Sequence, residues 1–200
     1  LNQAYEAIEN AQRILVVAHQ KPDGDTSGSS LALYSWLTGL NKEVTIFCRH
    51  ELPQQFHFMP NFEVITTDPS LFRKDWDLVI TCDSGDLAYA GVEDDLSVAA
   101  HGKLINIDHH ASNKLFGSIN LVNDKASSTA EVIYEFFNFH KVELTREIAV
   151  CLMTGVFTDT GGFSNGATNE QALKMASHFM RCGASLPDIH RATIANKSIA

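Results

Sequence analysis

The clearest pattern in the chain is a series of short apolar segments, rich in Val, Ile and Leu, that have the length of β-strands. They lie at residues 13–18, 43–48, 77–82 and 103–107, with a shorter candidate at 62–66. Residues 27–40 carry apolar side chains at helical spacing, and helix-like sequence separates most of the other segments. Strands that alternate with helices favour an α/β fold, so we predict a mostly parallel β-sheet flanked by helices.

After Asn120 the pattern becomes mainly helical. Residues 128–140, 145–158 and 169–182 each show apolar positions at helical spacing. Thr168 and Gln171 fit a capping box at the start of the last helix, and Gly183 fits its end. The sequence contains no internal repeat and no Gly/Ser linker, so we treat residues 1–200 as one domain with a mainly helical second half.

Composition places the chain among ordinary globular proteins. Of its 200 residues, 44% are hydrophobic, which is enough for a buried core. No apolar run approaches the roughly 20 residues of a membrane-spanning helix. The 4 cysteines lie far apart, and three of them sit in apolar runs, where a thiol behaves as a small hydrophobe. We therefore predict a cytoplasmic protein with reduced cysteines and no membrane partner.

Charge and the start of the chain add two expectations. The formal net charge of -9 disfavours passive binding to long nucleic acid, because neutralising a polyphosphate requires clustered Lys and Arg. The chain begins with Leu1, and residues 1–10 are polar and acidic, without the basic and apolar regions of a signal peptide. We expect the chain to be part of a longer protein.

Acidic and histidine side chains follow three of the predicted strands at the point where each strand ends. They are His19, Asp23 and Asp25 after residues 13–18, Asp83 after 77–82, and Asp108, His109 and His110 after 103–107. Because the carboxyl ends of parallel strands line the crevice where ligands bind, we expect these side chains to converge on one site.

A fourth segment adds Asp159, which ends an apolar helix-like run directly before Gly161 and Gly162. A buried helix end rarely keeps an unpaired Asp, and the glycines allow the backbone to approach a bound phosphate closely. Carboxylates gathered within a few ångströms repel one another unless cations neutralise them or some of them are protonated. Asp and His together suit Mn²⁺, with Mg²⁺, Co²⁺ and Zn²⁺ as competitors, and the absence of cysteine pairs argues against structural zinc.

Single residues in these segments also have simpler interpretations. Asp23-Gly24-Asp25 is typical of a surface turn, and Asp25-Thr26 would suit the cap of the following helix. A calcium loop does not fit, because Tyr34 stands at the twelfth position, where such a loop requires Glu. Ser127 and Ser128 precede a helix, where N-capping and a phosphate contact are both open.

Four stretches, in this order, resemble the motifs that define the DHH superfamily of phosphoesterases: His19-x-x-x-Asp23-x-Asp25, Asp83, Asp108-His109-His110 and Thr154-Gly155-x-x-x-Asp159-Thr160-Gly161. The resemblance implies a DHH catalytic domain with two metal ions, Mn²⁺ first and Mg²⁺ or Co²⁺ as alternatives. The metal ligands that it implies are His19, Asp23, Asp25, Asp83, His109 and Asp159. It further implies that Asp83 bridges the ions, that Asp108 orients a ligand, and that His110 contacts the scissile phosphate or assists the leaving group.

The resemblance also carries expectations about activity. It implies an Mn²⁺-dependent phosphoesterase in which a hydroxide bridging two metal ions attacks in line. Residues 159–163 and 127–129 resemble the nano-RNase (oligoribonuclease) and pAp phosphatase branch, which implies as substrates short RNA or DNA oligonucleotides or small nucleotides such as 3'-phosphoadenosine 5'-phosphate. In this family a DHHA1-type substrate-binding domain usually follows, which we expect beyond this chain, and members of the branch are often homodimers.

Two alternatives to this function stay open. A RecJ-type single-strand exonuclease is disfavoured by the acidic charge, because such an enzyme requires a basic track and stacking aromatic side chains. A non-catalytic nucleotide-binding or regulatory module would keep the metal site and lose turnover.

Overall fold

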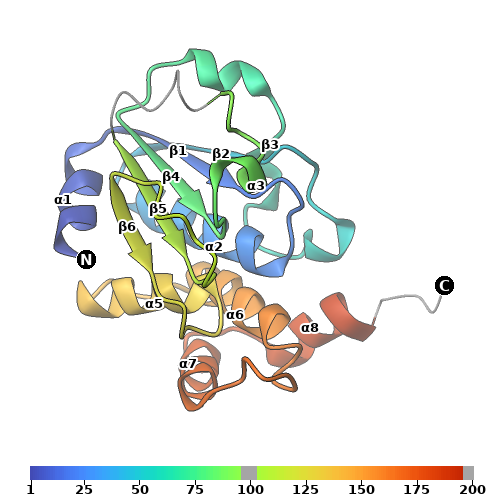
Figure 1. The fold of residues 1–200 in the computed structure, drawn as a ribbon. Helices are drawn as coiled ribbons and strands as arrows, with labels where there is room; N and C mark the ends of the chain where they lie inside the picture. Colours follow the sequence, from blue (N-terminus) through green and yellow to red (C-terminus); the bar gives the residue numbers. More distant parts are fainter. Residues whose placement is uncertain (96–102, 196–200) are drawn as a thin grey trace.

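Six strands form a single sheet in the computed structural model, which describes residues 1–95 and 103–195 (Figure 1). The strands are β1 (Arg13–Ala18), β2 (Glu43–Phe47), β3 (Ile65–Thr66), β4 (Leu78–Cys82), β5 (Leu104–Asp108) and β6 (Ile119–Val122). They lie in the order β3-β2-β1-β4-β5-β6, and every neighbouring pair is parallel. The predicted α/β fold with a parallel sheet is confirmed.

The strand order contains one reversal, between β1 and β4. From β1 the chain moves outward to β2 and β3, and it then returns to the other side of β1 to add β4, β5 and β6. At such a switch point the connections that leave neighbouring strands diverge to opposite sides of the sheet and open a crevice at its carboxyl end. The residues that follow β1 and β4 are therefore placed at the position where parallel sheets bind ligands.

Helices cover the sheet mainly on one face, with α2, α5 and α6 beside it and α7 and α8 further out (Figure 1). The helices are α1 (Asn2–Asn10), α2 (Gly24–Gly39), α3 (Leu87–Ala90), α5 (Thr129–Phe139), α6 (Arg146–Asp159), α7 (Glu170–Arg181) and α8 (Leu186–His190). Shorter helical turns are η1 (Gln54–Phe56), η2 (Phe62–Val64), η3 (Pro69–Arg73) and the π-helical η4 (Arg191–Ala195). None of the helices in the described part of the chain is both long and apolar enough to cross a membrane.

Both faces of the sheet are buried. On β1, Ile14 and Val16 face the helical layer, and Leu15 and Val17 face a smaller core that contains Phe47. This two-sided burial explains why the strands are continuous apolar runs instead of alternating ones. All four cysteines are free; Cys48, Cys82 and Cys151 are buried as predicted, and Cys182 is half-buried.

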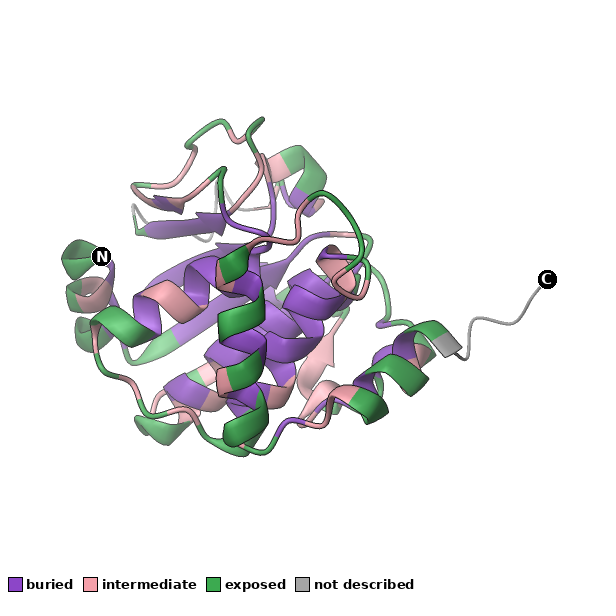
Figure 2. Cartoon of the chain, turned by 90° about the horizontal axis from the view of Figure 1, so that it is seen from below, coloured by how far each residue is buried: buried purple, intermediate pink, exposed green. Residues whose placement is uncertain are grey.

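Helix α2 lies between the sheet and α6, so nearly all of its sides are enclosed. Figure 2 shows buried positions filling the interior of the helical layer, with exposed positions on the outer helices. Glycines allow the two helices to approach closely: a Cβ on Gly28 would lie 2.3 Å from the carbonyl oxygen of Cys151. A Cβ on Gly24 would lie 2.4 Å from Oγ1 of Thr158, so the start of α2 meets the end of α6.

The helix boundaries differ from the sequence expectations at two capping sites. Helix α2 begins at Gly24 rather than Ser27, because Oδ1 of Asp23 accepts the backbone N–H groups of Asp25 and Thr26, both at 3.0 Å. The cap is therefore Asp23 and not the Asp25-Thr26 pair. Helix α7 is capped by Asn169, whose Oδ1 accepts from Ala172 N at 2.7 Å, so the predicted capping box was wrong.

The other differences concern short elements. The candidate strand at 62–66 contains only two strand residues, Ile65 and Thr66, after the turn η2. Strand β6 was not predicted, because it is only four residues long and includes the polar Asn120; of its residues only Leu121 is buried. Gly183 adopts φ +99 directly after the cap of α7, which confirms the predicted helix end.

Candidate metal centre

The carboxyl ends of β1, β4 and β5 and the end of α6 bring the predicted site residues together. Three groups of side chains each offer ligand-type atoms within 4.8 Å of one another; they are His19, Asp23 and Asp83; Asp83, His109 and His110; and Asp25, His109 and Asp159. The groups share Asp83 and His109, so together they form one continuous cluster. The predicted convergence of four separated stretches is therefore a feature of the fold.

Asp83 lies at the centre of this cluster. Its Oδ2 is 3.5 Å from Nε2 of His19, and its Oδ1 is 3.7 Å from Nε2 of His109. The backbone of Asp83 is in the left-handed region, with φ 59, and its N–H donates to the carbonyl of Ile107 at 2.9 Å. For an L-residue this conformation costs roughly 1–2 kcal/mol, least for Asp and Asn. Here it turns the chain at the end of β4 and aims the carboxylate between two histidines.

Asp25 is buried against the amino end of helix α5. Its Oδ2 accepts the backbone N–H of Thr129 at 2.6 Å, and its Oδ1 accepts that of Ala130 at 3.0 Å. The positive end of the helix dipole compensates the carboxylate at this position. The same Oδ2 lies 4.0 Å from Nε2 of His109, so Asp25 anchors α5 while its carboxylate still faces the cluster.

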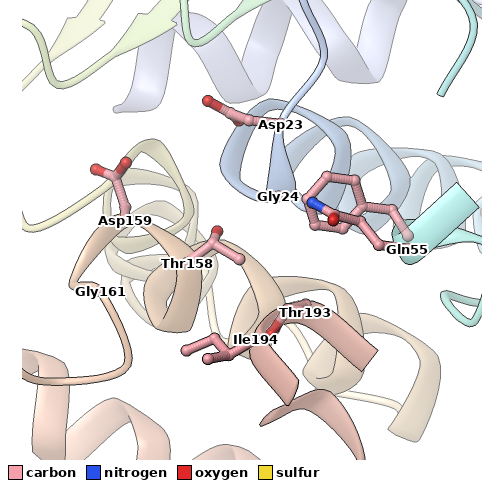
Figure 3. Close-up of a pocket in the computed structure, with 9 residues that line it drawn as sticks. Asp23, Gly24, Gln55, Thr158, Asp159, Gly161, Thr193 and Ile194 are labelled. Carbon is pink, nitrogen blue, oxygen red and sulfur yellow. The ribbon is translucent and has the colours of Figure 1, made fainter. Parts of the chain in front are cut away.

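Asp159 and Asp23 bring the two helix ends to the cluster. Oδ2 of Asp159, at the end of α6, lies 3.3 Å from Nε2 of His109. Oδ2 of Asp23, at the start of α2, lies 3.5 Å from Nε2 of His19. Figure 3 shows Asp23 and Asp159 on facing elements around one pocket, which has a volume of about 350 Å³.

Asp108 is buried, and it holds His110 rather than one of the other cluster residues. Its Oδ1 lies 2.7 Å from Nδ1 of His110, and its Oδ2 accepts a 2.6 Å hydrogen bond from Nδ2 of Asn113. The hydrogen bond to Asp108 raises the pKa of His110 above its ordinary value. His110 is half-exposed, so its ring is fixed at one edge and open to a ligand at the other.

Two residues that support the cluster were not identified from the sequence. Thr129 Oγ1 donates to Oδ1 of Asp83 at 2.8 Å, and Asn113 donates to Asp108. The signal for Thr129 was the Ser127-Ser128-Thr129 run before a helix, of which Ser128 is the N-cap that accepts from Glu131 N. For Asn113 no local signal exists, because it lies in the irregular segment between β5 and β6.

The electrostatics of the cluster favour the uptake of positive charge. Burial opposes protonation of His19, but hydrogen bonds and charge from Asp23 and Asp83 outweigh it and raise the pKa of His19 to about 9. Burial raises the pKa of Asp159 to about 6, against the opposing charge of His109. Burial and the charge of Asp83 likewise raise the pKa of Asp25 well above its ordinary range. The four carboxylates and three imidazoles of the cluster suit divalent cations such as Mn²⁺, which neutralise the gathered negative charge.

A second hollow adjoins the cluster at His110. It has a volume of about 410 Å³, and its lining includes Tyr89, His110, Ser112 and Lys114. The two hollows share no lining residue, and each includes part of the cluster. The first hollow contacts the cluster at Asp23 and Asp159, and the second contacts it at His110.

Known proteins resemble this chain in sequence and in structure. The bifunctional oligoribonuclease and PAP phosphatase NrnA of Thermus thermophilus is 32% identical over 176 residues, which are 88% of this chain and 52% of that protein. A probable manganese-dependent inorganic pyrophosphatase of Thermotoga maritima is 36% identical over 73 residues, 36% of this chain and 13% of that protein. The chain thus spans about half the length of the NrnA relative.

A solved structure extends this likeness to the whole described fold. The crystal structure of an exopolyphosphatase-related protein from Bacteroides fragilis matches with a TM-score of 0.91 and 28% identity. The match covers 99% of this chain and 61% of the Bacteroides fragilis chain. The parallel sheet and its helices are therefore shared with the Bacteroides fragilis protein.

The family itself follows from the sequence match and from the cluster. Residues 13–156 match the model of the DHH family, N-terminal domain, and they include every residue of the cluster except Asp159. The structure places Asp159 beside His109, in contact with the matched part. This chain belongs to the DHH family and contains its N-terminal domain.

Proposed function

We propose that this domain binds two divalent metal ions and hydrolyses phosphate esters in short oligoribonucleotides or small nucleotides such as 3'-phosphoadenosine 5'-phosphate. The observation that carries the proposal is the position of Asp83, whose two carboxylate oxygens face two different histidines. A carboxylate in this position suits a bridge between two cations. The name of the NrnA relative, an oligoribonuclease and PAP phosphatase, supports the substrate class.

The side chains divide into two sets around Asp83. His19 and Asp23 would hold one ion, and Asp25, His109 and Asp159 would hold the other, with Asp83 shared. The oxygen and imidazole donors suit Mn²⁺, which the name of the pyrophosphatase relative also contains, with Mg²⁺ or Co²⁺ as alternatives. A pair of such ions, when bound, lowers the pKa of water and neutralises charge on the attacking and leaving oxygens.

His110 is the residue of this chain best placed to act on the phosphate ester. Asp108 fixes its ring and raises its pKa, so the imidazole retains a proton more readily than a free histidine. A protonated, half-exposed imidazole can donate a hydrogen bond to a phosphate oxygen or a proton to the leaving oxygen. Asp108 acts through His110 as a positioning residue.

Acidic charge argues for small substrates. A net charge of -9 does not provide the electrostatic attraction that long single strands require, which disfavours a RecJ-type exonuclease. A short oligonucleotide requires fewer phosphate contacts than a long strand. The non-catalytic alternative is tested by measuring product formation, since nucleotide binding without product would favour a regulatory module.

The proposal is tested with the full-length protein, Mn²⁺ and RNA of two to five nucleotides. We expect release of mononucleotides that depends on Mn²⁺ and is abolished in Asp83→Ala. Asp188→Asn removes an exposed acid on α8 and serves as the matched control, with activity equal to the wild type. Activity on pyrophosphate without release of mononucleotides would overturn the substrate class, and an active Asp83→Ala variant would overturn the two-metal site.

A further inference from the structure

The two hollows beside the cluster differ in chemistry. The one in Figure 3 is lined by Asp23, Asp159, Gln55 and apolar or small residues, and no Lys, Arg or His is among its described lining residues. The other contains one acid, Asp86, which is paired with Lys114, and its remaining lining residues are Gly85, Tyr89, His110 and Ser112. The first hollow also contains an aromatic residue, Phe56, but that residue is buried, whereas Tyr89 in the second is exposed. A nucleotide is an anion with an aromatic base, so an exposed aromatic ring beside His110 and Lys114 favours the second hollow for its organic part.

Tyr89 presents an exposed aromatic ring at the rim of the cluster. Its residue surface is 45% exposed, while its ring centroid lies 5.0 Å from that of the buried His19. The backbone around it is fixed, because Tyr89 N donates to Oδ1 of Asp86 at 2.7 Å. One part of the ring therefore packs against the cluster while the rest is free to contact a ligand.

Other residues of the hollow supply polar groups. Nζ of Lys114 lies 2.7 Å from Oδ2 of Asp86, and the backbone N–H of Lys114 donates to the carbonyl of Gly85 at 2.9 Å. These contacts hold the Lys114 segment beside the start of α3, with Ser112 between it and His110 along the chain. The hollow thus leads from the proposed phosphate position at His110 to an ammonium group and an aromatic ring.

We propose that this hollow binds the nucleoside that adjoins the scissile phosphate, with its base stacked on Tyr89 and its ribose side near Ser112 and Lys114. The inference rests on the proposed function and adds a base-binding subsite to it. A volume of about 410 Å³ is within the range of pockets that hold small organic ligands. Because every base offers a π face, stacking on Tyr89 accepts all four bases and selects for the presence of a base.

The test compares a ligand that has a base with two that lack one. In the full-length protein with Mn²⁺, calorimetry measures the affinities for AMP, ribose 5-phosphate and inorganic phosphate. We expect the wild type to prefer AMP over ribose 5-phosphate by about tenfold to a hundredfold, the range of one stacked base. Tyr89→Ala brings this ratio close to one, and Tyr89→Phe restores most of it. The matched control is Phe139→Ala, which removes another exposed aromatic side chain, at the end of α5, and leaves the ratio unchanged.

Two outcomes would overturn the subsite. If Tyr89→Ala keeps the AMP preference, the base lies elsewhere. If Tyr89→Ala weakens the binding of inorganic phosphate as much as that of AMP, the tyrosine acts only by supporting His19. The proposed function fails in a different experiment, the release of mononucleotides from RNA. Even if the wild type releases none, the ratio of its affinities for AMP and ribose 5-phosphate still tests the subsite.

Discussion

Thr129 donates a 2.8 Å hydrogen bond from its hydroxyl to the carboxylate of Asp83, although 46 positions separate the two residues in the sequence. The backbone N–H of Thr129 donates at the same time to Asp25. The first residue of α5 therefore orients two carboxylates of the cluster. Hydrogen bonds of this kind orient metal ligands and adjust their basicity, so their loss affects a metal centre without removing a ligand.

We predict that Thr129→Val lowers kcat on short RNA, or the affinity for Mn²⁺, by about tenfold to a hundredfold. The substitution removes the hydroxyl and keeps the branched shape and the backbone N–H. Thr129→Ser, which retains the hydroxyl, is the control and keeps most of the activity. Steady-state kinetics across an Mn²⁺ titration measure both effects, and wild-type kinetics in Thr129→Val would show that the hydrogen bond has no role.

Asn113 provides a second prediction. Its Oδ1 accepts the backbone N–H of Leu115 at 2.7 Å, so its amide NH₂ must face Asp108. Without that donor Oδ2 of Asp108 loses its hydrogen bond, and Asp108 orients His110 less firmly. We predict that Asn113→Ala lowers kcat by about tenfold, with a smaller change in KM. The control is Asn10→Ala on α1, which removes an exposed amide far from the cluster and leaves kcat at the wild-type value. A wild-type kcat in Asn113→Ala would show that Asn113 does not position His110.

The stability of the metal-free protein should fall as pH rises. The pKa of Asp159 is raised from 3.8 to about 6, so the folded state binds this proton more tightly, and stability is lost between about pH 4 and 6. The pKa of His19 is raised from 6.5 to about 9, so its stabilising contribution is complete below pH 6.5 and is lost as pH rises through 9. Both shifts act in the same direction.

Asp159→Asn tests this prediction directly. At pH 8 without metal, we expect the variant to be more stable than the wild type by about 1–3 kcal/mol, because it lacks the half-buried carboxylate. Mn²⁺ should raise the Tm of the wild type and raise that of the variant much less. Thermal melts from pH 5 to 9, with chelator and with Mn²⁺, measure both effects. If the Tm of the wild type in chelator did not fall as the pH rises from 5 to 9, the electrostatic account would be contradicted.

The close contact of α2 and α6 leads to a prediction about stability. A Cβ on Gly28 would lie 2.3 Å from the carbonyl oxygen of Cys151, so Gly28→Ala must push the helices apart. We expect a loss of about 1–3 kcal/mol in the free energy of unfolding. Gly39→Ala, at the end of the same helix with no atom within 4 Å of the new Cβ, is the matched control and should not destabilise. Equal denaturation midpoints for the two variants would contradict the packing.

The strands and the residues that end them could be predicted from the sequence, because both are local properties. A strand buried on both faces is a continuous apolar run, as residues 13–18 and 77–82 are, and the side chain that follows such a run lies at its end in any arrangement of the sheet. The convergence of His19, Asp83 and His109 then required only that the strands be parallel. The family resemblance rested on those same positions.

The partners of the side chains were decided by tertiary structure alone. The two oxygens of Asp83 face different histidines because the backbone of Asp83 adopts φ 59, which no local pattern indicates. Thr129 reaches Asp83 because packing carries the start of α5 to the crevice. A hydrogen bond between distant residues depends on where whole elements pack, whereas periodicity records only which face of one element is buried.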